Sequence, residues 1–192
     1  FGNLLTGGNV PDRAGRLLAV ARELAERMRA GAYATAAGTA WYGRVPVGRT
    51  AGREQFGLLD GGFMTGTLGI AAFLAALWRV TGEAAYAVEA RRALCWTETL
   101  ATDAPAGPLP RSGLWNGEGG LVYGLAWVGL LLGAPEYGAL ARRLAARIEP
   151  EEEEARADPG LEAGLSGLVL ALAALGPDAA GGGRLARTLD LL

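Results

Sequence analysis

The segment 62–78, GFMTGTLGIAAFLAALW, decides the fold, because two glycines three residues apart run directly into an apolar stretch. From Ile70 onward apolar residues occupy every side of the predicted helix, which is typical of a helix buried all round. Thr65 is the expected N-cap. The pattern returns in segments 114–125, LWNGEGGLVYGL, and 161–172, LEAGLSGLVLAL. A spacing of about 50 residues between copies indicates a repeat architecture.

The glycine pairs of the three copies are expected to be structural. Glycine lets the chain turn sharply and lets neighbouring backbones approach closely. The alternative is direct ligand contact, since the first N–H groups of a helix are open to an anion. We expect packing to be the main role. The residues concerned are Gly66, Gly69, Gly117, Gly120, Gly164 and Gly167.

The composition excludes several function classes. The 192 residues are 51% hydrophobic and carry a net charge of −2 without a basic cluster, which argues against nucleic-acid binding. No apolar run reaches the length of a membrane span and no signal peptide is visible, so we expect a cytoplasmic protein. The chain has no His and one Cys, which excludes a disulfide framework and a Cys/His metal site built by this chain alone. Every basic residue is Arg, which suggests a GC-rich bacterium.

Buried and amphipathic helical patterns alternate along the chain. Segment 11–29 predicts an amphipathic outer helix, and segment 32–60 is expected to be irregular, with a short strand near Val45 and Val47. Segment 61–192 predicts helical-hairpin repeats, including one continuous amphipathic helix over 83–100. The acidic run 149–154 is expected to be a solvated loop. Buried helices wrapped by amphipathic ones predict an all-α fold, an α/α toroid of which this chain supplies about half the ring.

Few polar or aromatic residues stand out as candidates for chemistry. Glu118 lies between the glycines of the second copy, and Asp60 precedes the first copy, where it could also cap a turn. Cys95 is expected to be a small buried hydrophobe. Four aromatic residues could line a peptide-binding opening or simply pack. They are Trp41, Tyr42, Trp115 and Tyr123.

The run 59–77, with the following RVTGEAAY at 79–86, resembles the first repeat of the LanC-like cyclase domain of lanthipeptide synthetases. It is most similar to the version at the C-terminal end of class II (LanM) synthetases. Trp41-Tyr42-Gly43 and the two later glycine copies fall where that family has its other elements. The resemblance covers nearly all of residues 1–192, read as a single partial domain, the N-terminal half of the toroid.

The resemblance implies a helical toroid whose catalytic members bind zinc through Cys and His ligands. Zinc makes a thiolate of a substrate Cys, which adds to a dehydrated residue and forms a thioether ring. This chain has neither the Trp-Cys-x-Gly nor the Cys-His-Gly context of those ligands, and Cys95 matches no ligand position. Thr65 stands where the family often has Asp. We therefore expect no metal or cofactor bound by this chain and assign no catalytic residue.

Three functions remain open from the sequence. The first is part of a lanthipeptide synthetase cyclase domain, with a precursor peptide as substrate and the remaining half of the toroid or a partner chain supplying zinc. The second is a degenerate, non-catalytic LanC-like module for peptide binding or assembly, and the third is an α/α-barrel carbohydrate-active enzyme using Asp60 and Glu118. An exposed apolar edge on a half ring predicts that the chain dimerises, aggregates or pairs with a second polypeptide.

Overall fold

The computed structural model describes residues 10–46, 54–103, 113–115, 117–148, 159–176 and 182–191. The chain forms two compact units, residues 1–32 and 33–192. The first unit holds helix α1 (Val10–Ala30), in which Arg16 and Asp12 form an exposed ion pair at 3.1 Å. The helix predicted over 11–29 is therefore confirmed, while its place in an outer layer stays a prediction.

The described residues of segment 32–60 are not irregular as predicted, because most of them lie in strands. The segment contains a sheet of order β1-β2-β3, formed by β1 (Ala32–Ala34), β2 (Thr39–Pro46) and β3 (Glu54–Leu58). Strands β2 and β3 are antiparallel. Gly and Ala in the strands weaken the alternation that marks a strand, so the pattern is hard to see in the sequence. The short strand expected near Val45 lies in β2, and Val47 lies outside the described residues.

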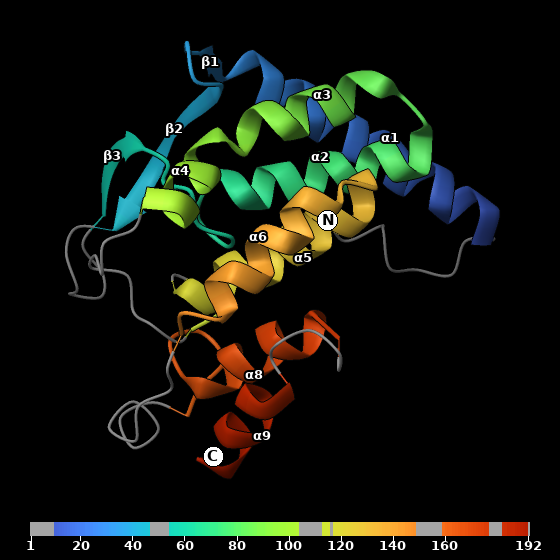
Figure 1. Ribbon diagram of the computed structural model, residues 1–192. Helices are drawn as coiled ribbons and strands as arrows, with labels where there is room; N and C mark the ends of the chain where they lie inside the picture. The colour runs from blue at the N-terminus through green and yellow to red at the C-terminus, as the bar shows by residue number, and fades with distance from the viewer. Residues whose placement is uncertain are drawn as a thin grey trace. The chain divides into compact units, whose positions relative to one another are not determined.

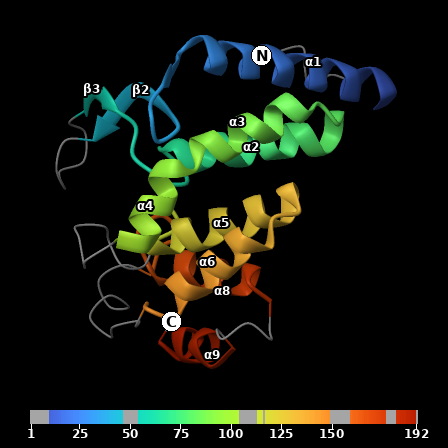
Figure 2. The same cartoon turned by 45° about the horizontal axis from the view of Figure 1, so that its top comes forward.

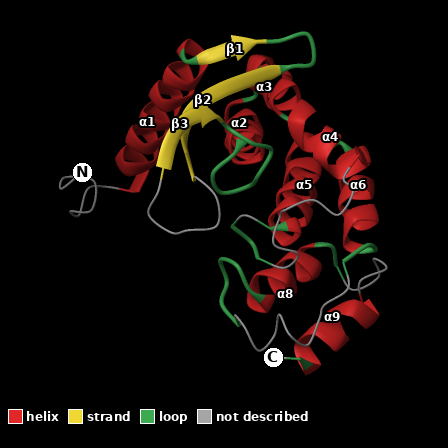
Figure 3. Ribbon diagram, turned by 90° about the vertical axis from the view of Figure 1, so that its left-hand side faces the viewer, coloured by secondary structure: helices red, strands yellow, loops and turns green. Residues whose placement is uncertain are grey.

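The helices of the second unit form two layers (Figure 1). The inner helices α2, α5 and α8 lie next to one another, with α5 between the other two, and outer helices pack behind them (Figures 2 and 3). The hairpin partners are α2 with α3, α5 with α6, and α8 with α9. This mostly helical, double-layered arc confirms the α/α toroid prediction, with the small sheet added to it. The inner helices are α2 (Thr67–Thr81), α5 (Glu118–Leu132) and α8 (Leu165–Ala174), and the outer ones α3 (Ala84–Ala93), α4 (Cys95–Asp103), α6 (Pro135–Ala145) and α9 (Gly182–Asp190).

Side-chain burial follows the layers. In α5, the apolar residues that meet α2, α6 and α8 are buried, among them Val122, Leu125 and Val128, none of which has any exposed surface. The outer helix α6 buries one face, including Tyr137 and Leu140, and exposes the Arg side chains of the other face. The buried faces supply most of the stabilisation, because apolar area removed from water is the dominant favourable term in folding.

Two local predictions are corrected. The helix expected over 83–100 breaks at Leu94, whose N–H donates to the carbonyl of Arg91 at 3.2 Å, so that α3 ends and α4 begins in a new direction. Thr65 is not the N-cap of α2, because Gly66 holds that position in an extended conformation without a side-chain cap bond. Helix α2 ends at Thr81, and the following Gly82 has a left-handed φ of 73°, which favours glycine. The acidic run 149–154 lies outside the described residues.

Candidate functional site at the inner-helix entries

The three inner helices begin with the same backbone conformation. The N-cap glycines Gly66, Gly117 and Gly164 have φ of −121°, −109° and −109° and ψ of −169°, 178° and −171°. These are extended values that any residue adopts, and none of the three helices has a side-chain cap bond. The repeat seen in the sequence is therefore a repeat of geometry, and glycine is not needed here for an unusual φ.

Close packing explains the second glycine of each pair. A Cβ on Gly69 would overlap the carbonyl oxygen of Phe63, six residues earlier. Gly120 stands in the same relation to the carbonyl of Leu114, and Gly167 to that of Leu161. Each inner helix thus starts with its own entry loop folded back against the first turn, an approach only glycine allows.

The entry loops of α5 and α8 are joined to each other. Leu114 N–H donates to the carbonyl of Leu161 at 3.1 Å, and Trp115 N–H donates to the carbonyl of Glu162 at 2.9 Å. Gly113, with φ of 22°, sits where a Cβ would meet the Glu162 carbonyl oxygen at 2.5 Å. These bonds connect residues of two different repeats and hold the two helix entries at one end of the inner layer.

Asp60 organises the entry loop of α2. Its Oδ1 accepts from Gly62 N–H at 2.9 Å, and its carbonyl accepts from Thr67 N–H at 2.8 Å. The neighbouring Gly61 carbonyl accepts from the buried Thr97 hydroxyl of α4 at 2.9 Å. Asp60 therefore caps a turn, the structural role that the sequence allowed for, and together these bonds fix the first entry against the outer layer.

Aromatic side chains extend from the entry loops along one face of α5 to beyond the middle of the helix. Phe63 meets Tyr123 edge to face, with ring centroids 5.4 Å apart, and Tyr123 lies 6.1 Å from Trp127. Trp115, in the entry loop, is 38% exposed, and Trp127 is 42% exposed. Tyr123 and Trp115 were candidates from the sequence. Phe63 and Trp127 were missed, although the spacing of four residues from Tyr123 to Trp127 places both on one helix face.

The other two aromatic candidates lie in the sheet. Trp41 is 7% exposed on β2 and belongs to the core, whereas Tyr42 is exposed and packs against Tyr33 and Phe56 of the neighbouring strands. A peptide-binding role for these residues stays a prediction. Because successive strand residues point to opposite faces, Trp41 and Tyr42 serve different surfaces.

Glu118 is the first residue of α5 and is half-buried. A carboxylate at this position interacts favourably with the positive end of the helix dipole, which gives Glu118 a structural reason to be acidic. Within the described ranges, no group of three or more His, Cys, Asp or Glu side chains could hold a metal ion. A catalytic role for Glu118 remains a prediction.

The zinc implied by the resemblance does not fit the residues of this chain. The chain has no His, and its one thiol, Cys95, begins the outer-layer helix α4. A Cβ on Gly38 would overlap the Cys95 sulfur and the Arg92 carbonyl, so the thiol packs tightly against the turn between β1 and β2. The donors for a thiolate and imidazole zinc site are therefore missing from this chain.

Burial raises the pKa of the Cys95 thiol above its ordinary value of 9.0, an effect only partly offset by hydrogen bonds from the backbone of Trp96 and Thr39. Because the thiolate is the reactive form, we expect iodoacetamide at pH 8 to modify Cys95 more slowly in the native protein than in urea. Mass spectrometry of the alkylated chain measures both rates. As the pH rises through 9.0, the Cys95 thiol ionises in the unfolded chain before it ionises in the folded chain. The contribution of Cys95 to the free energy of unfolding is therefore lost toward alkaline pH. Faster native labelling would contradict the packing of Cys95 against Gly38.

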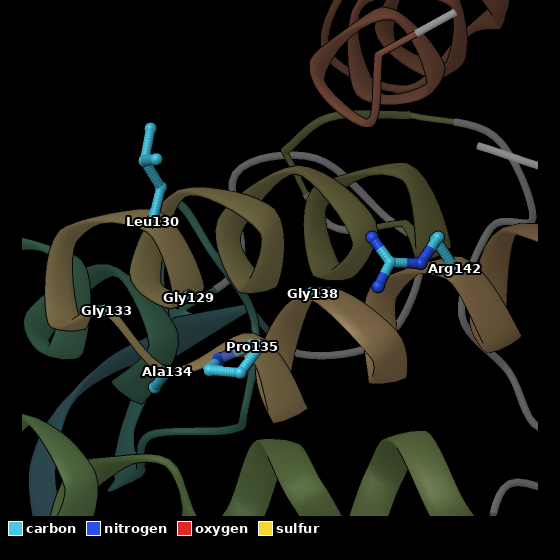
Figure 4. A pocket seen from close by; sticks show the side chains of 7 residues that line it. All are labelled: Gly129, Leu130, Gly133, Ala134, Pro135, Gly138 and Arg142. Atoms are coloured by element: carbon cyan, nitrogen blue, oxygen red, sulfur yellow. The ribbon is translucent and has the colours of Figure 1, made fainter. Parts of the chain in front are cut away.

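A hollow at the other end of α5 carries no candidate chemistry (Figure 4). It lies where α5 turns into α6, with Arg142 as its one charged side chain, and Leu130 points away from the turn in this view. The remaining lining residues are Gly129, Gly133, Ala134, Pro135 and Gly138. No helix among the described residues is long and apolar enough to span a membrane.

The sequence profile of the family described as "Lanthionine synthetase C-like protein" matches residues 58–179. The matched segment contains the three inner helices with their entry loops, and it begins at the last residue of β3. No curated protein matches the chain.

Proposed function

Because the chain belongs to the lanthionine synthetase C-like family, we propose that it forms part of the cyclase domain of a class II lanthipeptide synthetase. The parent reaction joins a cysteine sulfur of a precursor peptide to the β-carbon of a dehydrated residue, while a proton is added to the α-carbon. The observation that carries the proposal is the family match across all three inner helices, together with their identical entry geometry.

The role proposed for this chain is to hold the peptide. The hydrogen-bonded entry loops make a fixed rim, and the exposed rings of Trp115 and Trp127 offer apolar surface to a peptide side chain. Tyr123 is packed between Phe63 and Trp127 and holds the Trp127 ring in place. The metal ligands and the groups that move protons come from the remaining part of the toroid or from a partner chain. The exposed Leu161 and Leu170 of the third repeat support such pairing.

The second candidate is a non-catalytic LanC-like module that binds peptide or assists assembly. It is favoured by the complete lack of His and by Thr65 in place of the expected Asp. The carbohydrate-active alternative needs two free carboxylates facing one cleft. The hydrogen bond from Gly62 to Asp60 argues against it, because one partner of the nominated pair is engaged in a turn.

The test uses the purified chain and a synthetic peptide that carries one dehydroalanine and one Cys. We expect no stoichiometric zinc by elemental analysis and no acceleration of thiol loss over the uncatalysed rate, while the same peptide, labelled with a dye, binds the chain by fluorescence anisotropy. The peptide affinity of Trp127→Ala is compared with that of the exposed control Val88→Ala. A lower affinity of Trp127→Ala supports the peptide-holding role. Tight zinc at one ion per chain with ring formation would contradict the claim that the chemistry is supplied from elsewhere.

A further inference from the structure

The small sheet exposes a row of apolar side chains on one face. Tyr33 of β1 meets Tyr42 of β2 edge to face at 5.3 Å, and Tyr42 stacks on Phe56 of β3 at 6.1 Å with 19° between the rings. The exposed fractions are 57% for Tyr33, 51% for Tyr42, 77% for Phe56 and 41% for Leu58. One aromatic ring from each strand is thus held in a continuous exposed surface, which in a soluble protein marks an interaction site.

Among the described residues, the outer edge of β3 continues this surface with backbone groups that face no further strand. In the order β1-β2-β3, the described sheet ends at β3. The Leu59 N–H donates to the Trp41 carbonyl at 2.8 Å. This hydrogen bond identifies which opposite residues of β2 and β3 form hydrogen-bonded pairs and which form non-bonded pairs. Because bonded and non-bonded pairs alternate in an antiparallel ladder, the N–H and C=O of Phe56 and Leu58 point away from β2.

The position of Pro46 agrees with this assignment. Pro46 faces Glu54, two residues beyond the pair of Arg44 and Phe56, so it occupies a non-bonded position where its missing N–H costs nothing. The residues that direct backbone groups outward, Phe56 and Leu58, are also the ones whose side chains lie on the exposed apolar face. Backbone donors, backbone acceptors and apolar surface are therefore offered together.

We propose that the β3 edge binds an extended segment of the peptide substrate, which adds a fourth strand to the sheet. The occupant must be extended, because only a strand can match alternating N–H and C=O groups at an edge. It is expected to be apolar and uncharged at its centre, since Phe56 and Leu58 supply the side-chain contacts and the exposed Arg44 is already paired with Glu54 at 3.4 Å.

The place of the edge in the chain connects it with the peptide-holding rim. Strand β3 leads within two residues into Asp60 and the entry loop of α2, so a segment paired with β3 lies beside the first inner-helix entry. The inference rests on the proposed function in that the occupant is a peptide substrate. It extends that function to a part of the chain that, apart from Leu58, lies outside the family match.

Hydrogen exchange followed by NMR tests the edge directly. The probe is a blocked heptapeptide in which Thr alternates with Val around a central Tyr. In the free chain the amides of Phe56 and Leu58 are expected to exchange quickly, while Gly57, whose N–H points toward β2, is protected. Saturating peptide should slow exchange at Phe56 and Leu58 and leave the inner-helix amides unchanged. Protection at Leu114 and Trp115 instead would overturn the edge site and leave the proposed function standing.

Two controls separate strand pairing from simple apolar contact. The same peptide N-methylated at alternate amides should lose the protection effect, and equal binding by it would overturn the proposal. Phe56→Ser is expected to weaken binding about fivefold through loss of a cross-strand contact. The matched variant Val80→Ser, at a side chain 70% exposed on α2, should bind as the parent does. Protection that grows with protein concentration without peptide would show pairing of two copies at this edge and would also overturn the proposal.

Discussion

Replacing Gly167 with Ala is expected to lower the free energy of unfolding by about 3 kcal/mol, the upper range for overpacking a tight site. The added methyl would overlap the Leu161 carbonyl oxygen and the Leu114 amide nitrogen. These two atoms are partners in the hydrogen bond that joins the entry loops of α5 and α8, so relief of the overlap must separate them. Urea denaturation followed by circular dichroism measures the loss.

The matched control is Gly138→Ala in the outer helix α6. A Cβ there meets only the Arg142 Nη1 at 3.7 Å, a flexible side-chain end, so the helix accepts the methyl without strain. Replacing a helical Gly by Ala then raises stability by about 0.5–1 kcal/mol. Both glycines lie in helices, so helix propensity alone predicts a change in the free energy of unfolding of the same sign for both substitutions. Equal effects of the two substitutions would show that the Gly167 contact is not as close as described.

Truncating Leu125 to Ala is expected to lower the free energy of unfolding by about 3 kcal/mol, through lost burial and the cavity left behind. Leu125 has no exposed surface and lies in α5, the one inner helix that contacts both α2 and α8 as well as α6. Because α5 is packed against three other helices, little of the cavity is expected to collapse. Urea denaturation measures the difference in the free energy of unfolding between the variant and the parent. The slope of this free energy against urea concentration shows whether the unfolding transition itself has changed.

Leu130→Ala in the same helix is the control for Leu125→Ala. Leu130 is 71% exposed, so its truncation removes little buried area and is expected to change stability by no more than about 0.5 kcal/mol. Helix propensity is nearly the same for the two changes, because both replace Leu by Ala in one helix. A loss at Leu130 as large as that at Leu125 would mean that the exposed face of α5 is covered in solution.

The helical layers could be predicted because their signals are local. A mostly apolar helix favours the inner layer, and one with an Arg-rich face must border water, so α5 and α6 were assigned to the correct layers from neighbouring residues alone. The expectation that an inner helix is buried all round is wrong for α5, because Trp127 and Leu130 are exposed. The sheet was missed for the opposite reason. Its strands carry Ala or Gly at several positions, and β1 has only three residues. The aromatic face forms only when Tyr33, Tyr42 and Phe56 from three separate strands come together.

The candidate site divides in the same way. Asp60 and the glycine pairs were visible as motifs, and a turn cap was one of the two roles open to Asp60. What each second glycine packs against was not visible, because the carbonyl of Leu161 meets both Gly167 of its own repeat and the Leu114 amide of the repeat before it. Phe63 and Trp127 became parts of one cluster only through Tyr123, which lies between them.

The sequence by itself determined the repeat, the order of buried and amphipathic helices, and the lack of zinc ligands, since all three follow from residue types and their spacing along the chain. The tertiary structure alone decided that the glycines close hydrogen-bonded loops between repeats and that residues 32–34, 39–46 and 54–58 form a sheet with an exposed aromatic face. The physical reason is that periodicity reports which face of a segment avoids water. Which backbone atoms meet across repeats depends on contacts between residues far apart in the chain, and no local pattern encodes them.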